Sequence, residues 1–491
     1  MDRRRFLLAG STAALLGASG SRLAAAVATT NAPTVARPRP TPQQLRWQRD
    51  ELAMFVHLTV NTFTGKEWGD GTESPAIFNP RKLDARQWAR TAKQAGFRSM
   101  ILTAKHHDGF CLWPTATTQH SVKYSPWKHG HGDVVREFTD ACRAEGLGAG
   151  LYLSPWDRNA KVYGSGEPYN DFYIAQLTEL LTHYGPIVEV WFDGANGEGP
   201  NGRKQAYDWP RIHATVRKLQ PDAVMFSDAG PDVRWIGDEH GVAGDTCWSS
   251  IDPASVPYPG YDRPWVGDLL GHGDPHGSAW RPGESDVSIR PGWFWHADQN
   301  DQVRTPDDLM QLYFSSVGRN SKLLLNVPPN RDGLFEAEDI AALQGFTAQR
   351  TRLFAHDLLQ GATVRASSGT TAQATLDPDP DTHWSAAPAS RDGWLEFALP
   401  GTIEFDTLEL GEAIAHGQSI ANYRVERWHG GTWQALCWGT SIGHKKLTRF
   451  DPVRAGKLRV SLEFGYAAPR LARVAAYLGP GRRYGPGHDM K

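Results

Sequence analysis

Several carboxyl and imidazole side chains directly follow short apolar runs of the chain. His57 ends the first of these runs, and Asp193 ends a later one and is followed by Gly194, which leaves room for a ligand. Two more carboxyl groups, Glu284 and Asp286, lie close together farther along the chain. Glycoside hydrolysis uses one anionic carboxylate and one protonated carboxylic acid on the two sides of the scissile bond. The pattern fits that chemistry, although an Asp-Gly pair after a strand is also an ordinary turn.

The elements that would position these groups follow a regular alternation. Between residues 51 and 325, apolar runs alternate with segments of helical periodicity, as in a parallel β/α barrel or a doubly wound sheet. In the clearest helix, Asp84 can cap a run whose Trp88, Ala89 and Ala92 share one face. No Gly-x-Gly-x-x-Gly follows the first strand, which argues against a dinucleotide-binding fold. We therefore predict a (β/α)8 barrel with strands at residues 54–57, 99–103, 148–153, 188–192, 223–227, 234–237, 292–295 and 323–327.

In such a barrel the chemistry lies where strands end and loops begin. The polar and aromatic residues near the predicted strand ends are His57, Lys105, His106, His107, Asp108, Tyr152, Trp156, Asp193, Arg234, Glu239 and His240. Neighbouring strand residues point to opposite faces, so His106 and His107 would need an irregular strand end to share one metal. No spacing typical of a zinc site supports that arrangement. We therefore do not predict a metal site at these two rings, which leaves a core role open.

A second domain follows the barrel. Beyond residue 356 the pattern changes to period-two alternation, as at residues 394–397 and 458–462, which predicts a β-sandwich over 357–480 and a tail at 481–491. The Asp-rich stretch at 376–384, with 394–397, resembles discoidin-like (coagulation factor 5/8 type C) domains. That resemblance implies a structural calcium ion, and the alternative is a solvated Asp/Pro turn.

The N-terminus resembles a twin-arginine export signal. Arg3, Arg4 and Arg5 precede a short apolar stretch rich in small residues, and a run of three alanines at 24–26 suits cleavage. The apolar stretch is shorter than the roughly 20 residues of a membrane span, so no stable membrane insertion is expected. We predict a signal at 1–28, a flexible lead at 29–41, the catalytic barrel at 42–356, and a periplasmic or secreted protein.

Composition narrows the class further. The chain has 491 residues, a formal net charge of −2, 19 tryptophans and four cysteines without Cys-x-x-Cys spacing. The length predicts a large domain with at least one smaller one. The charge offers no attraction for nucleic acid, and the twin-arginine route exports proteins folded in a reducing compartment, so no disulfide framework is expected. Tryptophan is common in sugar sites and in cores alike, so its excess adds only modest weight.

Several motifs in combination resemble the α-L-fucosidases of glycoside hydrolase family 29. They are the segment 103–110 (TAKHHDGF) with Trp113, the pair Glu67-Trp68, Tyr152, and the segment 191–194 (WFDG), within a resemblance that covers roughly 46–355. The resemblance implies a (β/α)8 barrel, retention of configuration, no required cofactor or metal, and fucosylated glycans as substrates. It also implies that Asp193 is the nucleophile and that His57, Glu67, Trp68, His106, His107, Tyr152, Arg234 and Trp293 contact the sugar.

The acid/base is carried over from a narrower resemblance. The segment 284–294 resembles the subgroup that cleaves branched α-1,3/1,4 linkages, which implies that Glu284 donates the proton. Asp286 would raise the pKa of Glu284 by like-charge repulsion. Glu239 and Glu198 are the alternatives if Glu284 lies on a solvated loop. Alternative functions are an α-1,2 or α-1,6 preference, a non-catalytic glycan-binding protein, and a metal-dependent hydrolase that uses His57, His106 and His107.

Overall fold

The computed structural model describes residues 37–479. The predicted signal at 1–28, the first part of the predicted lead (29–36) and the predicted tail at 481–491 lie outside the described residues. Within residues 37–479, no helix is both long and apolar enough to cross a membrane.

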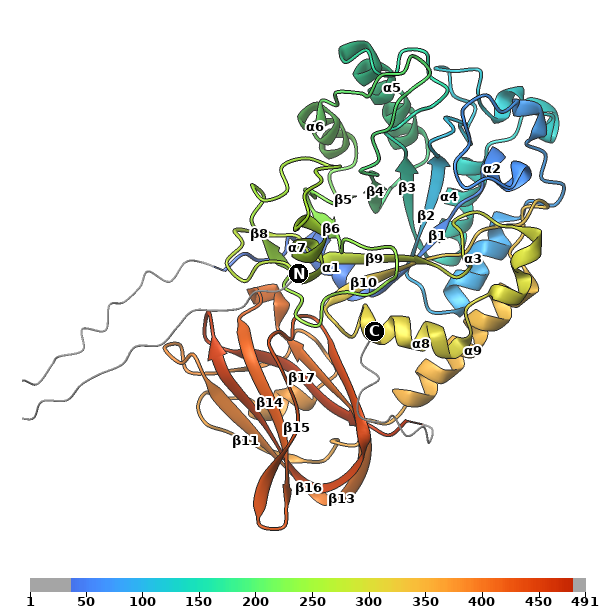
Figure 1. Cartoon of the computed structure of the whole chain (residues 1–491). Helices are drawn as coiled ribbons and strands as arrows, with labels where there is room; N and C mark the ends of the chain where they lie inside the picture. The colour runs from blue at the N-terminus through green and yellow to red at the C-terminus, as the bar shows by residue number, and fades with distance from the viewer. Residues whose placement is uncertain (1–36, 480–491) are drawn as a thin grey trace, which may run out of the picture. The chain divides into compact units, whose positions relative to one another are not determined.

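Within the described part of the chain, eight parallel strands close into a barrel in the order β1-β10-β9-β6-β5-β4-β3-β2 (Figure 1). The closure joins β2 back to β1, where Ala53 pairs with Ser99. The predicted barrel is therefore confirmed. Its strands are β1 (Leu52–Val56), β2 (Ser99–Lys105), β3 (Gly148–Leu153), β4 (Glu189–Trp191), β5 (Val224–Ser227), β6 (Val233–Trp235), β9 (Gly283–Ser288) and β10 (Ser321–Asn326).

Helices pack around the barrel, and each contributes buried residues (Figure 1). The predicted cap is present at the clearest of them, because the Asp84 carboxylate accepts hydrogen bonds from the first turn and Trp88, Ala89 and Ala92 are buried. The helices are α1 (Pro42–Asp50), α2 (Val60–Thr64), α3 (Ala85–Gln94), α4 (Val134–Glu145), α5 (Glu167–His183), α6 (Trp209–Leu219), α7 (Val266–His272), α8 (Pro306–Ser315) and α9 (Ala337–Leu353).

One predicted strand was wrong. The seventh barrel strand was expected at 292–295, but the structure places it at Gly283–Ser288, and the aromatic segment 292–295 belongs to the loop that follows. The strand has a polar sequence because its side chains bond inside the protein: Ser285 bonds to Ser321, and Asp286 to Trp235. An apolar run was therefore a misleading signal here, since buried strand residues can be polar when each has a partner.

The C-terminal β domain is antiparallel, with strands in the order β12-β17-β13-β16-β14-β15 and β11 paired to β13. Its own apolar core includes Leu395, Phe397, Leu458, Val460 and Leu471. The predicted β domain after the barrel is thus confirmed. Its strands are β11 (Thr363–Ala366), β12 (Trp384–Ser385), β13 (Gly393–Glu412), β14 (Ile420–His429), β15 (Thr432–Gly439), β16 (Lys446–Gly465) and β17 (Arg470–Tyr477); a separate small sheet joins β7 (Ser250–Ile251) to β8 (Ala279–Trp280).

A largely buried ion cluster joins the barrel to the β domain. Glu51, which directly precedes β1, lies 2.6 Å from Lys445 Nζ and 3.1 Å from His444 Nε2. Burial alone would raise the pKa of Glu51, but the Lys445 ammonium and the His444 hydrogen bond overcome that effect and lower it. Glu51 is therefore held ionised at the junction by two residues of the β domain.

The Asp-rich turn at 376–384 uses its carboxylates locally. Asp377 accepts from the backbone N–H of Asp379, Asp379 accepts from that of Asp381, and Asp381 pairs with Arg49. Among residues 37–479, no group of three or more His, Cys, Asp or Glu side chains could hold a metal ion. Calcium binding by this turn and its discoidin-like character stay predictions.

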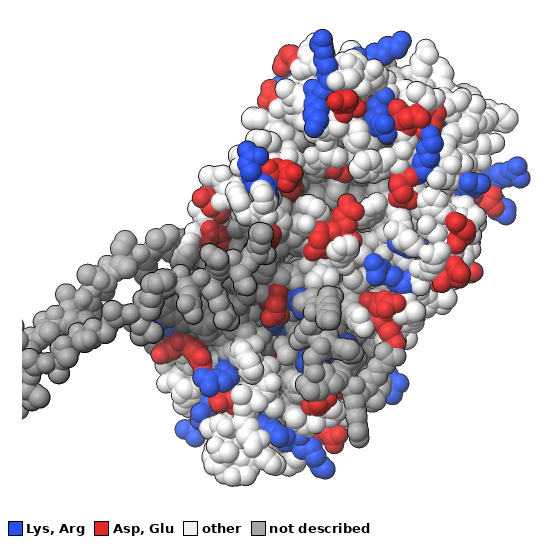
Figure 2. Space-filling model, viewed as in Figure 1, with Lys and Arg blue, Asp and Glu red and all other residues white. Residues whose placement is uncertain are grey.

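Charges of both signs are intermixed on the face of the molecule shown in Figure 2. Neither Lys and Arg nor Asp and Glu form a continuous patch across that face, which agrees with the formal net charge of −2. Such a surface offers no extended attraction for a polyanion. The four cysteines are unpaired and buried.

Candidate active site

A cavity of about 130 Å³ lies at the carboxyl ends of the barrel strands. Its walls combine aromatic rings, imidazoles and carboxyl groups from the ends of β1, β2, β3, β4 and β9, and from loops that include the one after β6. Small-ligand sites have this composition, an apolar lining with a few polar groups placed to fix orientation. The lining residues are Phe55, His57, Trp68, His106, His107, Tyr152, Trp191, Asp193, Ala195, Glu239, Asp286 and Trp293.

Asp193 follows β4 and presents its carboxylate to the cavity, with the side chain one quarter exposed. The hydroxyl of Tyr152 donates to Oδ2 at 2.9 Å, and the backbone N–H of Ala195 donates to Oδ1 at 2.6 Å. His107 Nε2 lies 3.8 Å from Oδ2. Both oxygens of Asp193 are thus held in fixed directions while the carboxylate stays open to a ligand, as a nucleophile requires.

Three imidazoles form one side of the cavity. His57 Nδ1 lies 2.9 Å from Asn326 Oδ1, and His107 Nδ1 lies 2.7 Å from the hydroxyl of Ser154. Burial lowers the pKa of His57 to about 3 and also lowers the pKa values of His106 and His107. The three rings are therefore neutral near pH 7, when each offers one donor and one acceptor nitrogen.

His106 has a ring nitrogen that makes no hydrogen bond within the described residues. Its Nδ1 is buried and has no partner among the described residues. A buried polar atom without a partner is costly unless a ligand or water satisfies it. The three histidines also do not form part of a metal-binding group within residues 37–479.

Aromatic rings form the rest of the wall. Trp191 stacks on Phe226, with ring centroids 4.2 Å apart and an angle of 8° between the planes. Trp68 is 57% exposed and meets Trp156 edge-on at 5.7 Å. Because flat rings stack on the C–H faces of sugars, an exposed Trp at the rim suits a carbohydrate ligand. Trp293, 5.4 Å from His57 between ring centroids, continues the same wall.

Glu239, in the loop after β6, lies at the exposed rim of the cavity. The indole N–H of Trp293 donates to its Oε2 at 3.3 Å. Partial desolvation raises the pKa of Glu239; the Trp293 hydrogen bond opposes that shift, and the negative charge of Asp193 adds to it. A carboxyl group with a raised pKa can keep a proton for donation near neutral pH.

Asp286 lies deeper in the same cavity. It is 3% exposed, and the indole N–H of Trp235 donates to its Oδ1 at 2.7 Å. Burial, and then the neighbouring charge of Glu239, raise the pKa of Asp286 well above its usual range. A carboxyl group with a raised pKa can keep a proton and donate a hydrogen bond into the cavity.

The structure does not place Glu284 in the cavity, contrary to the sequence prediction. Glu284 is the second residue of β9, is fully buried, and accepts from the indole N–H of Trp191 at 3.0 Å. Burial and the adjacent Glu189 raise its pKa, Lys322 opposes them, and Asp286 adds only a small effect. Because the strand begins earlier than predicted, Glu284 lies inside the barrel beneath the Trp191 ring.

Arg234 also lies away from the cavity. It is fully buried, Nε donates to the carbonyl oxygen of Leu270 at 2.9 Å, Nη1 donates to that of Arg281, and Nη2 lies 3.7 Å from Cys247 Sγ. Side chains alternate along a strand, and Trp235 is the β6 residue that reaches into the barrel, to Asp286. The prediction that Arg234 contacts the sugar is therefore wrong, because the side chain that points into the barrel belongs to the next residue, Trp235.

Glu67 supports the cavity wall from behind. Its Oε2 accepts from the backbone N–H of Trp293 at 2.7 Å, and its Oε1 lies 2.7 Å from His296 Nε2. A Cβ at Gly292 would lie 2.3 Å from Glu67 Oε1, so only glycine fits there without movement. Glu67 thus fastens the loop after β9, which carries Trp293, to the loop after α2.

Some of the predicted site residues line the cavity and others do not. Glu67, Arg234 and Glu284 do not line the cavity, whereas Glu239, foreseen only as an alternative, does. Phe55 and Trp191 were missed as cavity residues; Phe55 is two positions before His57, so strand alternation could have placed both on one side. The predicted residues that the cavity brings together are His57, Trp68, His106, His107, Tyr152, Asp193 and Trp293.

Comparison with known proteins identifies the group to which this fold and cavity are related. Residues 42–348 match the family model described as alpha-L-fucosidase. The chain is 43% identical to alpha-L-fucosidase 1 of Arabidopsis thaliana, over 90% of this chain and 88% of that protein. The crystal structure of SpGH29 superposes with a TM-score of 0.84 at 40% identity, covering 91% of this chain and 100% of that one. A Ruminococcus gnavus fucosidase of family GH29, solved in complex with fucose, gives a TM-score of 0.82 at 32% identity over 92% of this chain and 97% of that chain.

Proposed function

Because the chain belongs to the α-L-fucosidases of glycoside hydrolase family 29, we propose that it releases L-fucose with retention of configuration, with Asp193 as nucleophile and Glu239 as acid/base. One observation carries this assignment. The cavity contains an oriented carboxylate, Asp193, and a rim carboxyl group, Glu239, whose pKa is raised in part by the charge of Asp193. Two carboxyl groups in unlike environments are what acid and nucleophile require.

The reaction then proceeds in two displacements. Asp193 attacks the anomeric carbon, the bond from that carbon to the glycosidic oxygen breaks, and the departing oxygen takes the proton of Glu239. Glu239, now a carboxylate, removes a proton from water, whose oxygen attacks the same carbon and displaces Asp193. The products are L-fucose and the remaining glycan, and both side chains return to their initial states.

The neutral imidazoles suit the recognition of a deoxy sugar. His57 and His107 have their Nδ1 atoms engaged by Asn326 and Ser154, so their Nε2 atoms are available to sugar hydroxyls. His106 also lines the cavity and supplies a third imidazole for the ligand. The exposed Trp68 ring offers an apolar surface for the methyl-bearing side of fucose.

Stereochemistry of azide rescue tests the two roles separately. In the Asp193→Ala variant, azide would replace the nucleophile and give the β-fucosyl azide, whereas in Glu239→Ala it would attack the fucosyl-enzyme and give the α-fucosyl azide. NMR of the products distinguishes these two compounds. Wild-type turnover by Asp193→Ala, or a β-product from the wild-type enzyme, would overturn the proposed mechanism.

For the substrate, we propose α-1,3 and α-1,4 fucosyl branches on N-acetylglucosamine. The support is the resemblance of the segment 284–294 to the branch-cleaving subgroup, together with the position of Asp286 and Trp293 from that segment in the cavity wall. Product release from defined α-1,2, α-1,3, α-1,4 and α-1,6 fucosides, followed by chromatography, tests it. Preferential release from the α-1,2 or α-1,6 substrate would contradict the proposed linkage.

The two remaining alternatives make different predictions. A glycan-binding protein without activity would bind a Lewis-type trisaccharide and leave it intact, and a metal-dependent hydrolase would lose activity on chelation. We propose that chelation leaves the activity unchanged, because the proposed chemistry needs only carboxyl groups. We also propose export to the periplasm or medium by the twin-arginine route, which replacement of Arg3, Arg4 and Arg5 by lysine should block.

A further inference from the structure

The loop between β7 and α7 carries a group of aromatic rings that is open to solvent. Tyr258 and Trp265 are 49% and 47% exposed, and Tyr261 contacts both. The ring centroids of Tyr258 and Tyr261 are 5.4 Å apart, and those of Tyr261 and Trp265 are 6.3 Å apart. The three rings therefore form one continuous surface, and we call residues 258–265 the aromatic loop. Single exposed apolar residues are ordinary, but a contiguous exposed group is typical of a binding site.

The backbone of the aromatic loop is stiff. The N–H of Tyr261 donates to the carbonyl oxygen of Tyr258 at 3.2 Å, which closes a tight turn. Gly260 has a φ of 80°, the conformation that a type II turn requires at the position after Pro259. Proline removes backbone freedom at Pro259 and again at Pro264. The rings are thus held in place before a ligand arrives, which lowers the entropic cost of binding.

The aromatic loop touches the residue that follows the proposed nucleophile. A Cβ at Gly260 would lie 2.4 Å from the carbonyl oxygen of Gly194, so the two backbones are in direct contact. Gly194 directly follows Asp193. Asp228, directly after β5, fixes this contact, because its Oδ2 accepts from the backbone N–H of Gly260 at 2.8 Å. The aromatic loop therefore lies beside the active-site cavity, next to Asp193.

The end of the aromatic loop lies beside the segment that carries the proposed acid/base. A Cβ at Gly237 would lie 2.5 Å from the carbonyl oxygen of Gly267, which is two residues beyond Trp265. Gly237 in turn is two residues before Glu239, at the rim of the cavity. The segment 260–267 thus runs across the carboxyl ends of β4, β5 and β6, from the neighbour of the nucleophile to the loop of the acid/base.

The position of Glu239 fixes where the rest of the substrate must lie. A general acid protonates the glycosidic oxygen, so the sugar joined to that oxygen is next to Glu239 while fucose occupies the cavity. The cavity, of about 130 Å³, is below the range of about 300–1,000 Å³ that larger ligands occupy. The leaving glycan must therefore extend over the rim. Its sugar rings present C–H faces, which stack on flat aromatic side chains.

We propose that the aromatic loop binds the leaving glycan, the neutral sugar residues to which the fucose is attached. Tyr258 and Trp265 pack against the C–H faces of those residues, and Asp228 is a positioning residue that holds the loop beside Asp193. This inference rests on the proposed function, because Glu239 as acid/base places the leaving glycan at this rim. The loop then favours fucosylated oligosaccharides over fucosides with a small leaving group.

Two substrates with the same fucosyl group separate the aromatic loop from the chemistry. α-L-Fucosyl fluoride has a leaving group of one atom, too small to reach the loop, and the second substrate is the fucosyl oligosaccharide that the wild-type enzyme cleaves fastest. We expect Tyr258→Ala and Trp265→Ala each to lower kcat/KM on the oligosaccharide by about 2- to 10-fold relative to the fluoride, mainly through a higher KM. A shift in only one variant assigns the contact to that ring. A wild-type ratio between the substrates in both variants would overturn the proposal.

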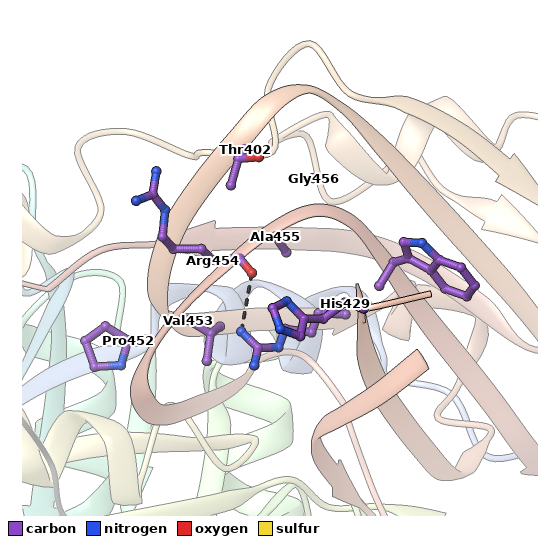
Figure 3. A pocket seen from close by; sticks show the side chains of 10 residues that line it. Thr402, His429, Pro452, Val453, Arg454, Ala455 and Gly456 are labelled. Carbon is purple, nitrogen blue, oxygen red and sulfur yellow. Dashed lines mark hydrogen bonds between the residues drawn. The ribbon is translucent and has the colours of Figure 1, made fainter. Parts of the chain in front are cut away.

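Matched variants control for the loss of any tryptophan. Trp265→Phe keeps an aromatic ring and should retain most of the wild-type ratio between the substrates. Trp428 is 42% exposed and lines a hollow of about 570 Å³ on the C-terminal β domain (Figure 3), so Trp428→Ala should leave the ratio unchanged. The thermal midpoint reports the folding of each variant, and Tyr258→Ala serves if Trp265→Ala does not fold.

The wild-type enzyme separates a failure of this inference from a failure of the proposed function. No release of fucose from either substrate by the wild-type enzyme would refute the proposed function. Release from both substrates, with the same ratio in the wild-type enzyme and in the Tyr258→Ala and Trp265→Ala variants, would refute only the role of the aromatic loop.

Discussion

Separate replacement of Glu239 and Glu284 by glutamine distinguishes the rim carboxyl group from the buried one. A general acid contributes about 10²–10⁴-fold to the rate, or about 2.7–5.4 kcal/mol at 1.36 kcal/mol per tenfold change. We expect Glu239→Gln to lose that factor on a Lewis-type trisaccharide, because its glycosidic oxygen must be protonated as it leaves. Glu284 accepts a hydrogen bond from Trp191 and shares another with the buried Glu189, and a glutamine can replace both with its carbonyl oxygen and its amide N–H. The cost of Glu284→Gln is then about one neutral hydrogen bond, 0.5–1.5 kcal/mol, or roughly tenfold at most.

The assay compares two leaving groups across pH. A 4-nitrophenyl fucoside has a leaving group that needs little protonation, so Glu239→Gln should lose much less on this substrate than on the trisaccharide. The alkaline limb of the kcat/KM profile should also vanish in Glu239→Gln, because that limb reports the proton of the acid. Glu284→Gln should keep the limb and the ratio between the substrates. The reasoning is refuted if Glu284→Gln shows the leaving-group dependence and Glu239→Gln does not.

Three further predictions concern residues around Asp193 and in the cavity wall. Tyr152→Phe removes the hydroxyl that donates to Asp193 Oδ2 and should lower kcat by about 10- to 100-fold, the worth of a hydrogen bond to a charged group, with the thermal midpoint as a check on folding. Gly292→Ala places a Cβ 2.3 Å from Glu67 Oε1 and should raise KM by displacing the Trp293 loop, whereas the control Gly401→Ala, with nothing within 4 Å, should leave kinetics unchanged. His57 has a pKa of about 3 in the folded protein, against an ordinary value of 6.5. Between these two pH values the unfolded state binds one more proton, so this group lowers the free energy of unfolding by about 1.4 kcal/mol for each unit by which the pH falls. In urea titrations between pH 6 and 4, His57→Asn should reduce that slope by one proton, and an unchanged slope would contradict the burial of a neutral ring.

The barrel was predictable because its signals are local. The cap at Asp84 and the apolar face of Trp88, Ala89 and Ala92 are set by short-range periodicity, and both are present in the structure. The apolar strands β1, β2, β3 and β10 overlap the segments predicted from their composition. β9 was missed because its polar residues find partners on other strands, as Ser285 does on Ser321 and Asp286 on Trp235. Such partners are distant in sequence, so no local pattern reveals them.

The same limit explains which site residues were misplaced. Asp193, His57 and Tyr152 end or follow apolar strands, and strand ends meet at one side of a barrel. Glu284 and Arg234 depended on exact strand boundaries, and a shift of one residue reverses the direction of a side chain. Glu239 follows the short strand β6, and only the fold shows that its loop reaches the cavity.

The ion cluster at Glu51 has a consequence for any attempt to separate the two folds. Glu51 is held ionised by Lys445 and His444, which come from the far end of the sequence. A barrel expressed alone would lose both cations, and it would also lose Leu447, Ala475 and Tyr477 of the β domain, which belong to its apolar core cluster. Burial of apolar surface is the dominant stabilising term in folding, so the exposed core surface weighs more than the lost ion pairs. Truncation after residue 356 should therefore yield insoluble or partly unfolded material, and the two halves should melt in one cooperative transition.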